Sequence, residues 1–241
     1  MKPLVLGHRG ACAYAPENTL AAFNLAFEMG ADGVELDVTL TKDGVPVVIH
    51  DDKVDRTTNG HGRINAMTLA EVKRLDASHK FDKYRGETIP TLEEVLRAVG
   101  NRGIVNIEIK SSTLRTDGIE AATLTVIRDT ATHNNILISS FNPLALLRMH
   151  DLDPTLPRGL LYASDMPIYL RRAWLRPIAR PSTLHPRFSM ITPKFVVWAR
   201  SKDYKINTWT VDEPTEMKRL IDLGIDAIIS NKPDVLRATV G

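Results

Sequence analysis

The sequence predicts a (β/α)₈ barrel in one domain covering residues 1–241, with a small insertion after the second strand. Short apolar runs alternate with segments of helical period along the whole chain, which is typical of parallel strands joined by helices. The 241 residues are close to the ~250 typical of such barrels. No Gly-x-Gly-x-x-Gly turn follows the first expected strand, which disfavours a doubly wound dinucleotide-binding sheet.

The elements follow in order along the chain. A strand at 4–7 comes first, and a helix at 18–29 follows, with Asn18 as its expected N-cap and Gly30 beyond its end. Two strands, at 33–40 and 45–49, flank the turn 42–44. The other strands are expected at 104–109, 136–139, 159–161, 183–185, 205–209 and 227–229, and the other helices at 69–75, 92–99, 118–133, 143–151, 213–223 and 233–239.

One segment interrupts the alternation. Residues 51–89 are polar and rich in turn-forming residues, so we expect an insertion between the second strand and the next helix of the barrel. The chain contains no linker rich in proline, glycine or serine. We therefore expect this segment to belong to the same domain.

Three carboxylates are expected to share the barrel interior. Successive side chains of a strand face opposite sides, so in 33–40 Glu35 and Asp37 point inward while the valines and leucines between them point to the helices. The same alternation directs Glu108 and Lys110 inward from 104–109. A set of buried carboxylates fits Mg²⁺ or Ca²⁺. The alternative is an interior salt-bridge network in which Lys110 and Arg9 neutralise the acids.

Two histidines follow strands at the same end of the barrel. His8 and Arg9 come directly after the first strand, and His50 follows the strand at 45–49. A guanidinium binds phosphate oxygens with two hydrogen bonds and keeps its charge. We interpret the histidines as an acid–base pair beside an anion site.

The composition excludes several classes of protein. A 43% apolar, 25% charged chain with net charge +2 is ordinary for a soluble protein and gives no case for nucleic-acid binding. Cys12 is the only cysteine, so no internal disulfide is possible. The first apolar run is too short for a signal peptide, and no run reaches 18 apolar residues. We expect a cytoplasmic protein.

The sequence resembles the glycerophosphodiester phosphodiesterase family over nearly its whole length. The resemblance is carried by an ordered series of short motifs: His8-Arg9-Gly10, Pro16-Glu17-Asn18-Thr19, Glu35-Leu36-Asp37-Val38, His50-Asp51, Arg56-Thr57-Thr58-Asn59-Gly60, Ile89-Pro90-Thr91-Leu92, Glu108-Ile109-Lys110, Ser140-Phe141 and Thr208-Trp209-Thr210-Val211. One departure is Asn231 in Ser230-Asn231-Lys232-Pro233, where the family often has an acid. It puts a supporting carboxylate in question, not the metal site.

The resemblance implies a TIM barrel that hydrolyses glycerophosphodiesters to an alcohol and sn-glycerol 3-phosphate with a divalent metal, Mg²⁺ or Ca²⁺. It implies roles for specific residues. The metal ligands would be Glu35, Asp37 and Glu108, the acid–base pair His8 and His50, the phosphate ligands Arg9 and Lys110, and the residues lining the substrate pocket Phe141, His185 and Trp209. Either water or the glycerol 2-hydroxyl could be the attacking oxygen. The alternatives are a related phospholipase D-like enzyme acting on membrane-derived lysophospholipids and a non-catalytic barrel that binds phosphodiesters.

A basic segment stands outside these motifs. Residues 166–202 contain no acid, and 168–180 mixes arginines with aromatic and aliphatic side chains. Such a mixture is typical of segments that lie on anionic membranes. The alternative is an exposed loop or helix with extended arginines.

Overall fold

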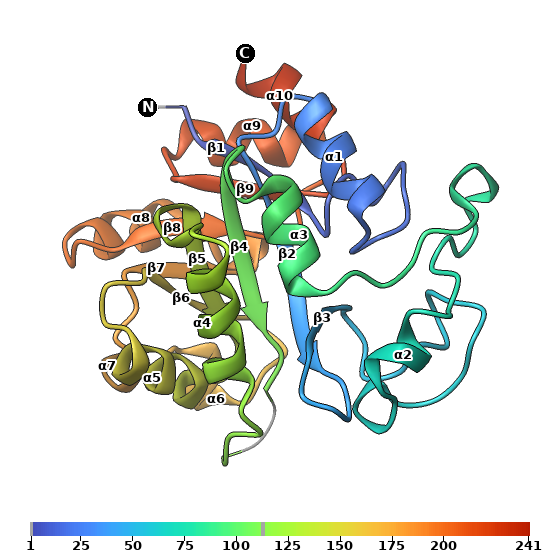
Figure 1. Ribbon diagram of the computed structural model, residues 1–241. Helices are drawn as coiled ribbons and strands as arrows, with labels where there is room; N and C mark the ends of the chain where they lie inside the picture. The colour runs from blue at the N-terminus through green and yellow to red at the C-terminus, as the bar shows by residue number, and fades with distance from the viewer. Residues whose placement is uncertain (1, 112–113) are drawn as a thin grey trace.

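Eight parallel strands close into a barrel in the computed structural model, which describes residues 2–111 and 114–241 (Figure 1). Pairing of β1 with both β2 and β9 closes the ring, which confirms the predicted (β/α)₈ fold. The barrel strands are β1 Leu4–His8, β2 Gly33–Leu40, β4 Ile104–Ile109, β5 Ile136–Ser140, β6 Arg158–Tyr162, β7 Thr183–Pro186, β8 Lys205–Thr208 and β9 Ala227–Ser230.

β3 lies outside the barrel and corrects the expectation that all strands are parallel. β3 (Pro46–Val48) runs antiparallel to the end of β2, with Val38 opposite Val48. β2 is long enough for its first residues to pair with β1 and its last with β3. The β2–β3 hairpin therefore lies beside the ring and carries His50 back toward the carboxyl ends of the strands.

Helices surround the barrel, and most match the predicted segments. They are α1 Leu20–Glu28, α2 Leu69–Val72, α3 Leu92–Val99, α4 Ile119–Asp129, α5 Pro143–Leu152, α6 Ile168–Arg171, α7 Arg176–Ala179, α8 Pro193–Arg200, α9 Pro214–Asp222 and α10 Pro233–Val240. The predicted N-cap of the first helix is wrong. Thr19 caps α1 by accepting a hydrogen bond from the Ala22 amide, and the Asn18 side chain instead donates to Asp37.

The main core lies between the barrel and its helices. Val34, Leu36 and Val38 belong to it, and the residues between them on β2 face the barrel interior, as the alternation predicted. At the amino-terminal end, the interior is filled by an apolar cluster that includes Leu6, Ile104 and Ile229. The polar site therefore occupies the carboxyl-terminal end, where β4 points away from both chain termini (Figure 1).

The segment from 51 to 89 lies to one side of the barrel (Figure 1). It has a separate hydrophobic cluster that includes Val54, Ile64, Val72 and Ile89, and this cluster reaches β3 through Val47. Among the described residues, none of the helices has the length and apolar character needed to cross a membrane.

Candidate active site

Strand register brings the three predicted carboxylates together. Glu35 and Asp37 are two residues apart on β2, and β4 places Glu108 directly opposite Asp37. All three are buried, and one oxygen from each lies within 4.8 Å of the other two. This is the arrangement that alternation on two neighbouring strands predicted.

Charge repulsion within this cluster is strong. Burial, with repulsion from Asp37 and Glu108, raises the pKa of Glu35 well above its usual range. Burial also raises the pKa of Glu108 to about 7, although Lys110 opposes the shift. Asp37 differs because Lys110 and Arg9 lower its pKa against the effect of burial. The Lys110 ammonium lies 3.0 Å from Asp37 Oδ1 and 2.7 Å from Glu108 Oε1.

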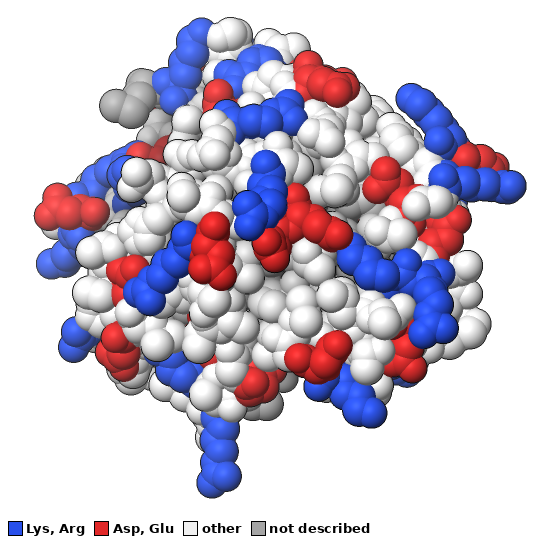
Figure 2. Space-filling view, in the orientation of Figure 1, with Lys and Arg blue, Asp and Glu red and all other residues white. Residues whose placement is uncertain are grey.

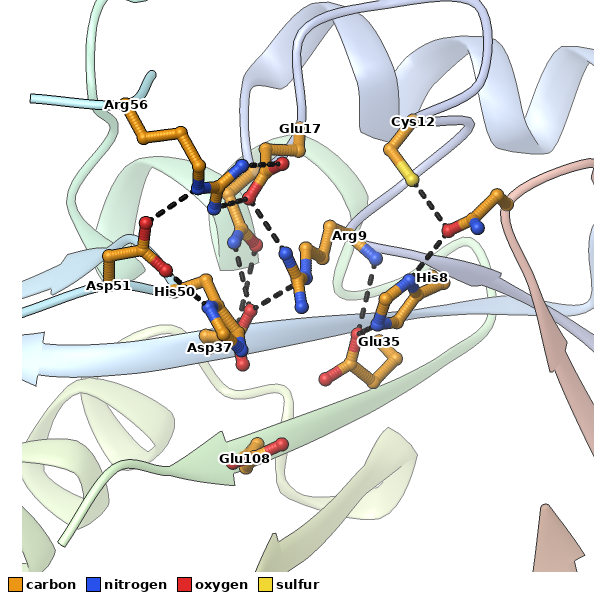
Figure 3. A network of polar contacts seen from close by, with 12 residues as sticks. His8, Arg9, Cys12, Glu17, Glu35, Asp37, His50, Asp51, Arg56 and Glu108 are labelled. Carbon is orange, nitrogen blue, oxygen red and sulfur yellow. Dashed lines mark hydrogen bonds and ion pairs between the residues drawn. The ribbon is translucent and has the colours of Figure 1, made fainter. Parts of the chain in front are cut away.

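Arg9 joins this cluster to a chain of ion pairs across the first loop (Figure 3). Its Nε lies 3.3 Å from Asp37 Oδ2, and its terminal nitrogen donates to Glu17 over 2.8 Å. Glu17 also accepts two hydrogen bonds of 2.7 Å from Arg56, which donates to Asp51 over 2.6 Å. These contacts connect β2 to the segment from 51 to 89.

The backbone of the first loop is bent to make these contacts. Arg9 has φ of 52° and Asn18 has φ of 58°, a left-handed conformation that is uncommon for residues other than glycine. The bend directs the Arg9 amide at Glu35 Oε2, 3.1 Å away. It also lets Asn18 Nδ2 donate to Asp37 over 2.9 Å. Strained backbone of this kind is common at functional sites.

His8 is held in one tautomer by two residues from the last strands. Asn231 Nδ2 donates to Asp212 over 2.5 Å, so Asn231 Oδ1 must face His8 Nδ1, at 2.6 Å. Nδ1 therefore carries the proton, and the Nε2 lone pair is left on the side of Glu35, whose carboxylate is 4.0 Å away. Burial and the nearby Arg9 lower the pKa of His8 to about 4, so the ring is a neutral base.

His50 has a different partner. Its Nδ1 lies 2.6 Å from Asp51 Oδ1, and both side chains are about one-third exposed, at 34% and 32%. Burial lowers the pKa of His50, while Asp37 and the Asp51 hydrogen bond oppose the shift. A carboxylate on Nδ1 stabilises the imidazolium form. In Figure 3, the two histidines lie on either side of Arg9.

The two histidines line one pocket of about 170 Å³. Two aromatic rings, Phe141 and Trp209, form part of its wall and meet edge to face at 5.4 Å. The lining residues are His8, Arg9, Glu35, His50, Asn106, Glu108, Lys110, Ser139, Phe141, Leu161, Trp209, Thr210 and Ile229. Among the predicted site residues, Asp37 and His185 do not line it.

His185 corrects the expectation of direct substrate contact. It is fully buried, and the pocket lining does not include it. Its Nε2 lies 3.2 Å from Asn207 Nδ2, and its carbonyl accepts a hydrogen bond from the Trp209 indole over 2.9 Å. Burial lowers the pKa of His185 to about 3. The backbone carbonyl of His185 thus supports the Trp209 ring behind the pocket wall.

Two buried polar side chains in the pocket have unused hydrogen-bonding atoms. Both amide atoms of Asn106 and the Ser139 hydroxyl have no partner among the described residues, although each side chain is almost fully buried. Native proteins seldom leave such groups unsatisfied without a ligand or ion. Both side chains line the pocket, so a small shift would bring these atoms to a bound molecule.

The residues present fit a divalent cation. Three carboxylates offer hard oxygen ligands. Burial, together with the neighbouring carboxylates, raises the pKa of Glu35 and of Glu108, so a bound cation would stabilise their charged forms. The connected network contains five carboxylates and three fixed cations, a difference of two charges. They are Glu17, Glu35, Asp37, Asp51 and Glu108, with Arg9, Arg56 and Lys110.

The sequence reasoning overlooked the residues that hold the histidines. Asp51 contacts His50, and Arg56 donates to Asp51. Both residues lie in family motifs, and a carboxylate directly after a histidine is a sequence feature that could have indicated this contact. Asn231 was seen only as a departure, whereas it is the direct partner of His8. Asp212 had no sequence signal, because its contact with Asn231 depends on the meeting of β8 and β9.

Comparisons with known proteins agree on one family. The model of the "Glycerophosphoryl diester phosphodiesterase family" matches residues 8–235. A glycerophosphodiester phosphodiesterase of Caldanaerobacter subterraneus subsp. tengcongensis is 44% identical over 98% of this chain and 97% of its own. An Oleispira antarctica phosphodiesterase, solved with the product sn-glycerol-3-phosphate, is 33% identical with a TM-score of 0.89 over 99% of this chain and 97% of its own. A glycerophosphodiester phosphodiesterase structure from Agrobacterium tumefaciens is 29% identical with a TM-score of 0.85, over 98% and 99%.

Proposed function

Because this chain belongs to the glycerophosphoryl diester phosphodiesterase family, we propose that it hydrolyses glycerophosphodiesters to an alcohol and sn-glycerol 3-phosphate. The observation that carries the proposal is the meeting of two histidines and a carboxylate cluster at one pocket. Two of the relatives described above are named glycerophosphodiester phosphodiesterases, and the third, a phosphodiesterase, was solved with the product sn-glycerol-3-phosphate. They do not favour the lysophospholipid alternative.

Glu35, Asp37 and Glu108 would hold Mg²⁺ or Ca²⁺. The bound ion would offset negative charge on the phosphoryl oxygens. Side chains of the protein would orient the substrate and transfer the protons.

Arg9 and Lys110 are the proposed phosphate ligands. Arg9 lines the pocket while Glu17 and Asp37 fix its guanidinium, so little side-chain entropy is lost when phosphate binds. Asn106 and Ser139 offer unpaired polar atoms to the glycerol hydroxyls. Phe141 and Trp209 supply an apolar wall for the substrate.

His8 suits the role of general base and His50 that of general acid. His8 is neutral, and Asn231 leaves its Nε2 lone pair free toward the pocket. It can remove a proton from the attacking oxygen, which is either water or the glycerol 2-hydroxyl. His50 can protonate the departing alcohol oxygen from Nε2, because its other nitrogen rests on the Asp51 carboxylate.

The proposed activity requires the barrel and residues 51–89 together. His50 and Asp51 stand at the start of that segment, and Arg56 connects it to Glu17 of the first loop. We therefore propose that residues 1–241 act as one catalytic domain.

The test is release of glycerol 3-phosphate from glycerophosphocholine and glycerophosphoethanolamine, with Mg²⁺, Ca²⁺ or EDTA. We expect metal-dependent release, reduced by orders of magnitude in His8→Ala and in His50→Ala while thermal unfolding is unchanged. His61→Ala is the matched control, because His61 is 87% exposed and away from the pocket. Turnover near that of the unaltered enzyme in either pocket variant would refute the assignment.

The attacking oxygen can be identified in the same assay. If the glycerol 2-hydroxyl attacks, a cyclic glycerol phosphate accumulates before glycerol 3-phosphate in a single turnover. If water attacks directly, no cyclic species forms at any time; ¹⁸O from labelled solvent enters the phosphate on either route, because water also opens a cyclic phosphate.

A further inference from the structure

A second pocket lies just outside the barrel wall, beside α6 and α8. Its volume is about 370 Å³. Leu161 lines the catalytic pocket and the next residue, Tyr162, lines the outer one, since successive side chains of a strand face opposite sides. The two pockets are therefore separated only by the carboxyl end of β6. The outer pocket is lined by Tyr162, Arg171, Arg172, Met190, Phe195 and Trp198.

The lining combines aromatic rings with guanidinium groups. Phe195 and Trp198 lie 5.7 Å apart, and the Arg176 guanidinium stands over the Trp198 ring at 5.2 Å. This cation–π contact packs the start of α7 against α8. The pocket thus offers an apolar interior with cations at its edge.

Large apolar side chains are exposed along the same segment. Ile168 is 44% exposed, Tyr169 46%, Trp174 59% and Ile178 40%. A single exposed residue of this kind is ordinary, whereas a group beside an open pocket marks a binding surface. Tryptophan and tyrosine are the side chains that favour the interface between water and lipid.

The charge of the segment is of one sign. Residues 166–202 contain no acid, and no carboxylate of the described residues lies within 4.0 Å of Arg171, Arg172, Arg176 or Arg180, since the ion pairs involve other arginines. Figure 2 shows acidic and basic side chains interspersed over the face it draws. Arg171 and Arg172, which line the outer pocket without an ion pair to any described residue, are therefore available to anions from outside.

We propose that this surface, formed by Tyr162, residues 166–180 and α8, docks on an anionic phospholipid membrane. The arginines would bind lipid phosphates, for which a guanidinium is well shaped, and the exposed apolar side chains would enter the interface. The outer pocket would receive one lipid headgroup and the start of its chain. Docking would bring the carboxyl ends of the strands, and with them the catalytic pocket, to the membrane surface. This inference stands apart from the proposed function, because it concerns residues outside the catalytic pocket.

Vesicle co-sedimentation tests the proposal with the complete chain. Vesicles of phosphatidylcholine with phosphatidylglycerol are compared with vesicles of phosphatidylcholine alone, at low and at 0.5 M salt. The test variant is Arg171→Gln/Arg172→Gln. The matched control is Arg63→Gln/Arg85→Gln, which removes the same charge from exposed arginines that pair with Asp52 and Asp82. Thermal unfolding verifies that each variant is folded.

We expect binding to anionic vesicles only, and we expect salt to weaken it. The test variant should bind about 30-fold more weakly, because each arginine removed near an anionic surface leaves roughly one fifth of the affinity. The control should bind as the unaltered protein does. Trp174→Ser should also bind more weakly without loss of stability, because its ring is mostly exposed. Equal binding to both vesicle types, equal loss in the control, or no binding at all would overturn the proposal. Stronger binding to a single-stranded oligonucleotide than to anionic vesicles would assign the surface to nucleic acid instead.

Discussion

Replacing Asp51 by asparagine tests the acid role of His50 with a minimal change in shape. The Asp51 carboxylate is 2.6 Å from His50 Nδ1, and a hydrogen bond between charged groups is worth about 1.5–3 kcal/mol net. Both side chains are about one-third exposed, so solvent screening favours the lower end of that range. A loss of about 1.5–2 kcal/mol corresponds to a fall of about 10- to 30-fold in kcat/KM.

The pH profile distinguishes this role from a structural one. Burial already lowers the pKa of His50, and the Asp51 hydrogen bond opposes the shift. Asp51→Asn removes that opposition, so the pKa of His50 falls further and the acid form disappears at a lower pH. The alkaline limb of kcat/KM should therefore move to lower pH in the variant.

Asp52→Asn is the matched control for this measurement. Asp52 is the next carboxylate along the chain, is 77% exposed and pairs with Arg63 rather than with a histidine. We expect its kcat/KM and pH profile to equal those of the unaltered enzyme. If Asp51→Asn leaves the alkaline limb in place, or if Asp52→Asn moves it equally, His50 is not the acid that the geometry indicates.

Three further predictions concern other parts of the molecule. Asn231→Leu should lower kcat about 10- to 100-fold with little change in KM, because His8 loses the acceptor that fixes its tautomer. His8 becomes charged as it takes up the proton, and a hydrogen bond to a charged group is worth about 1.5–3 kcal/mol; an equal rise in KM would contradict this positioning role. Mg²⁺ or Ca²⁺ at about 100 times its Kd should stabilise the protein by about 2.7 kcal/mol, or roughly 5–10 °C in Tm; the same rise in Glu108→Gln would place the ion elsewhere. Gly159→Ala should destabilise the protein by about 1–3 kcal/mol in denaturant unfolding, because the added Cβ would stand 2.3 Å from His185 Nε2; unchanged stability would show that the ring moves freely.

Local patterns in the sequence predicted the barrel and its acidic interior. Alternation along β2 and β4 depends only on neighbouring residues, and it located Glu35, Asp37 and Glu108 on the inner face. Parallel register then brings Asp37 opposite Glu108. The ends of most strands and helices were predicted to within a residue or two for the same reason.

Contacts between distant residues could not be predicted in this way. Asn18 looked like a helix cap because asparagine is a favoured cap, yet its side chain reaches Asp37 and leaves the cap to Thr19. His185 lies on the strand β7, and alternation alone does not say whether an inward side chain is open to the pocket or covered. Both errors concern tertiary neighbours.

The shortest helices were missed as well. α6 and α7 have four residues each, too few to show a helical period. α8 has a clearer start, with Thr192 as its cap and Pro193 in its first turn, but its residues belong to the long basic segment, whose composition hides the start of a helix. Short helices of this kind owe their stability to packing, such as the contact of Arg176 with Trp198.

The separate hydrophobic cluster of the segment from 51 to 89 has a consequence for heat inactivation. This small core holds β3, whose next residues lead to His50, whereas the carboxylates belong to the barrel wall. A small core opens at a lower free energy than a large one. Warming should therefore displace His50 while the ring of strands is still closed. Activity should be lost on heating and regained on cooling over a range of temperature in which the barrel has not begun to melt.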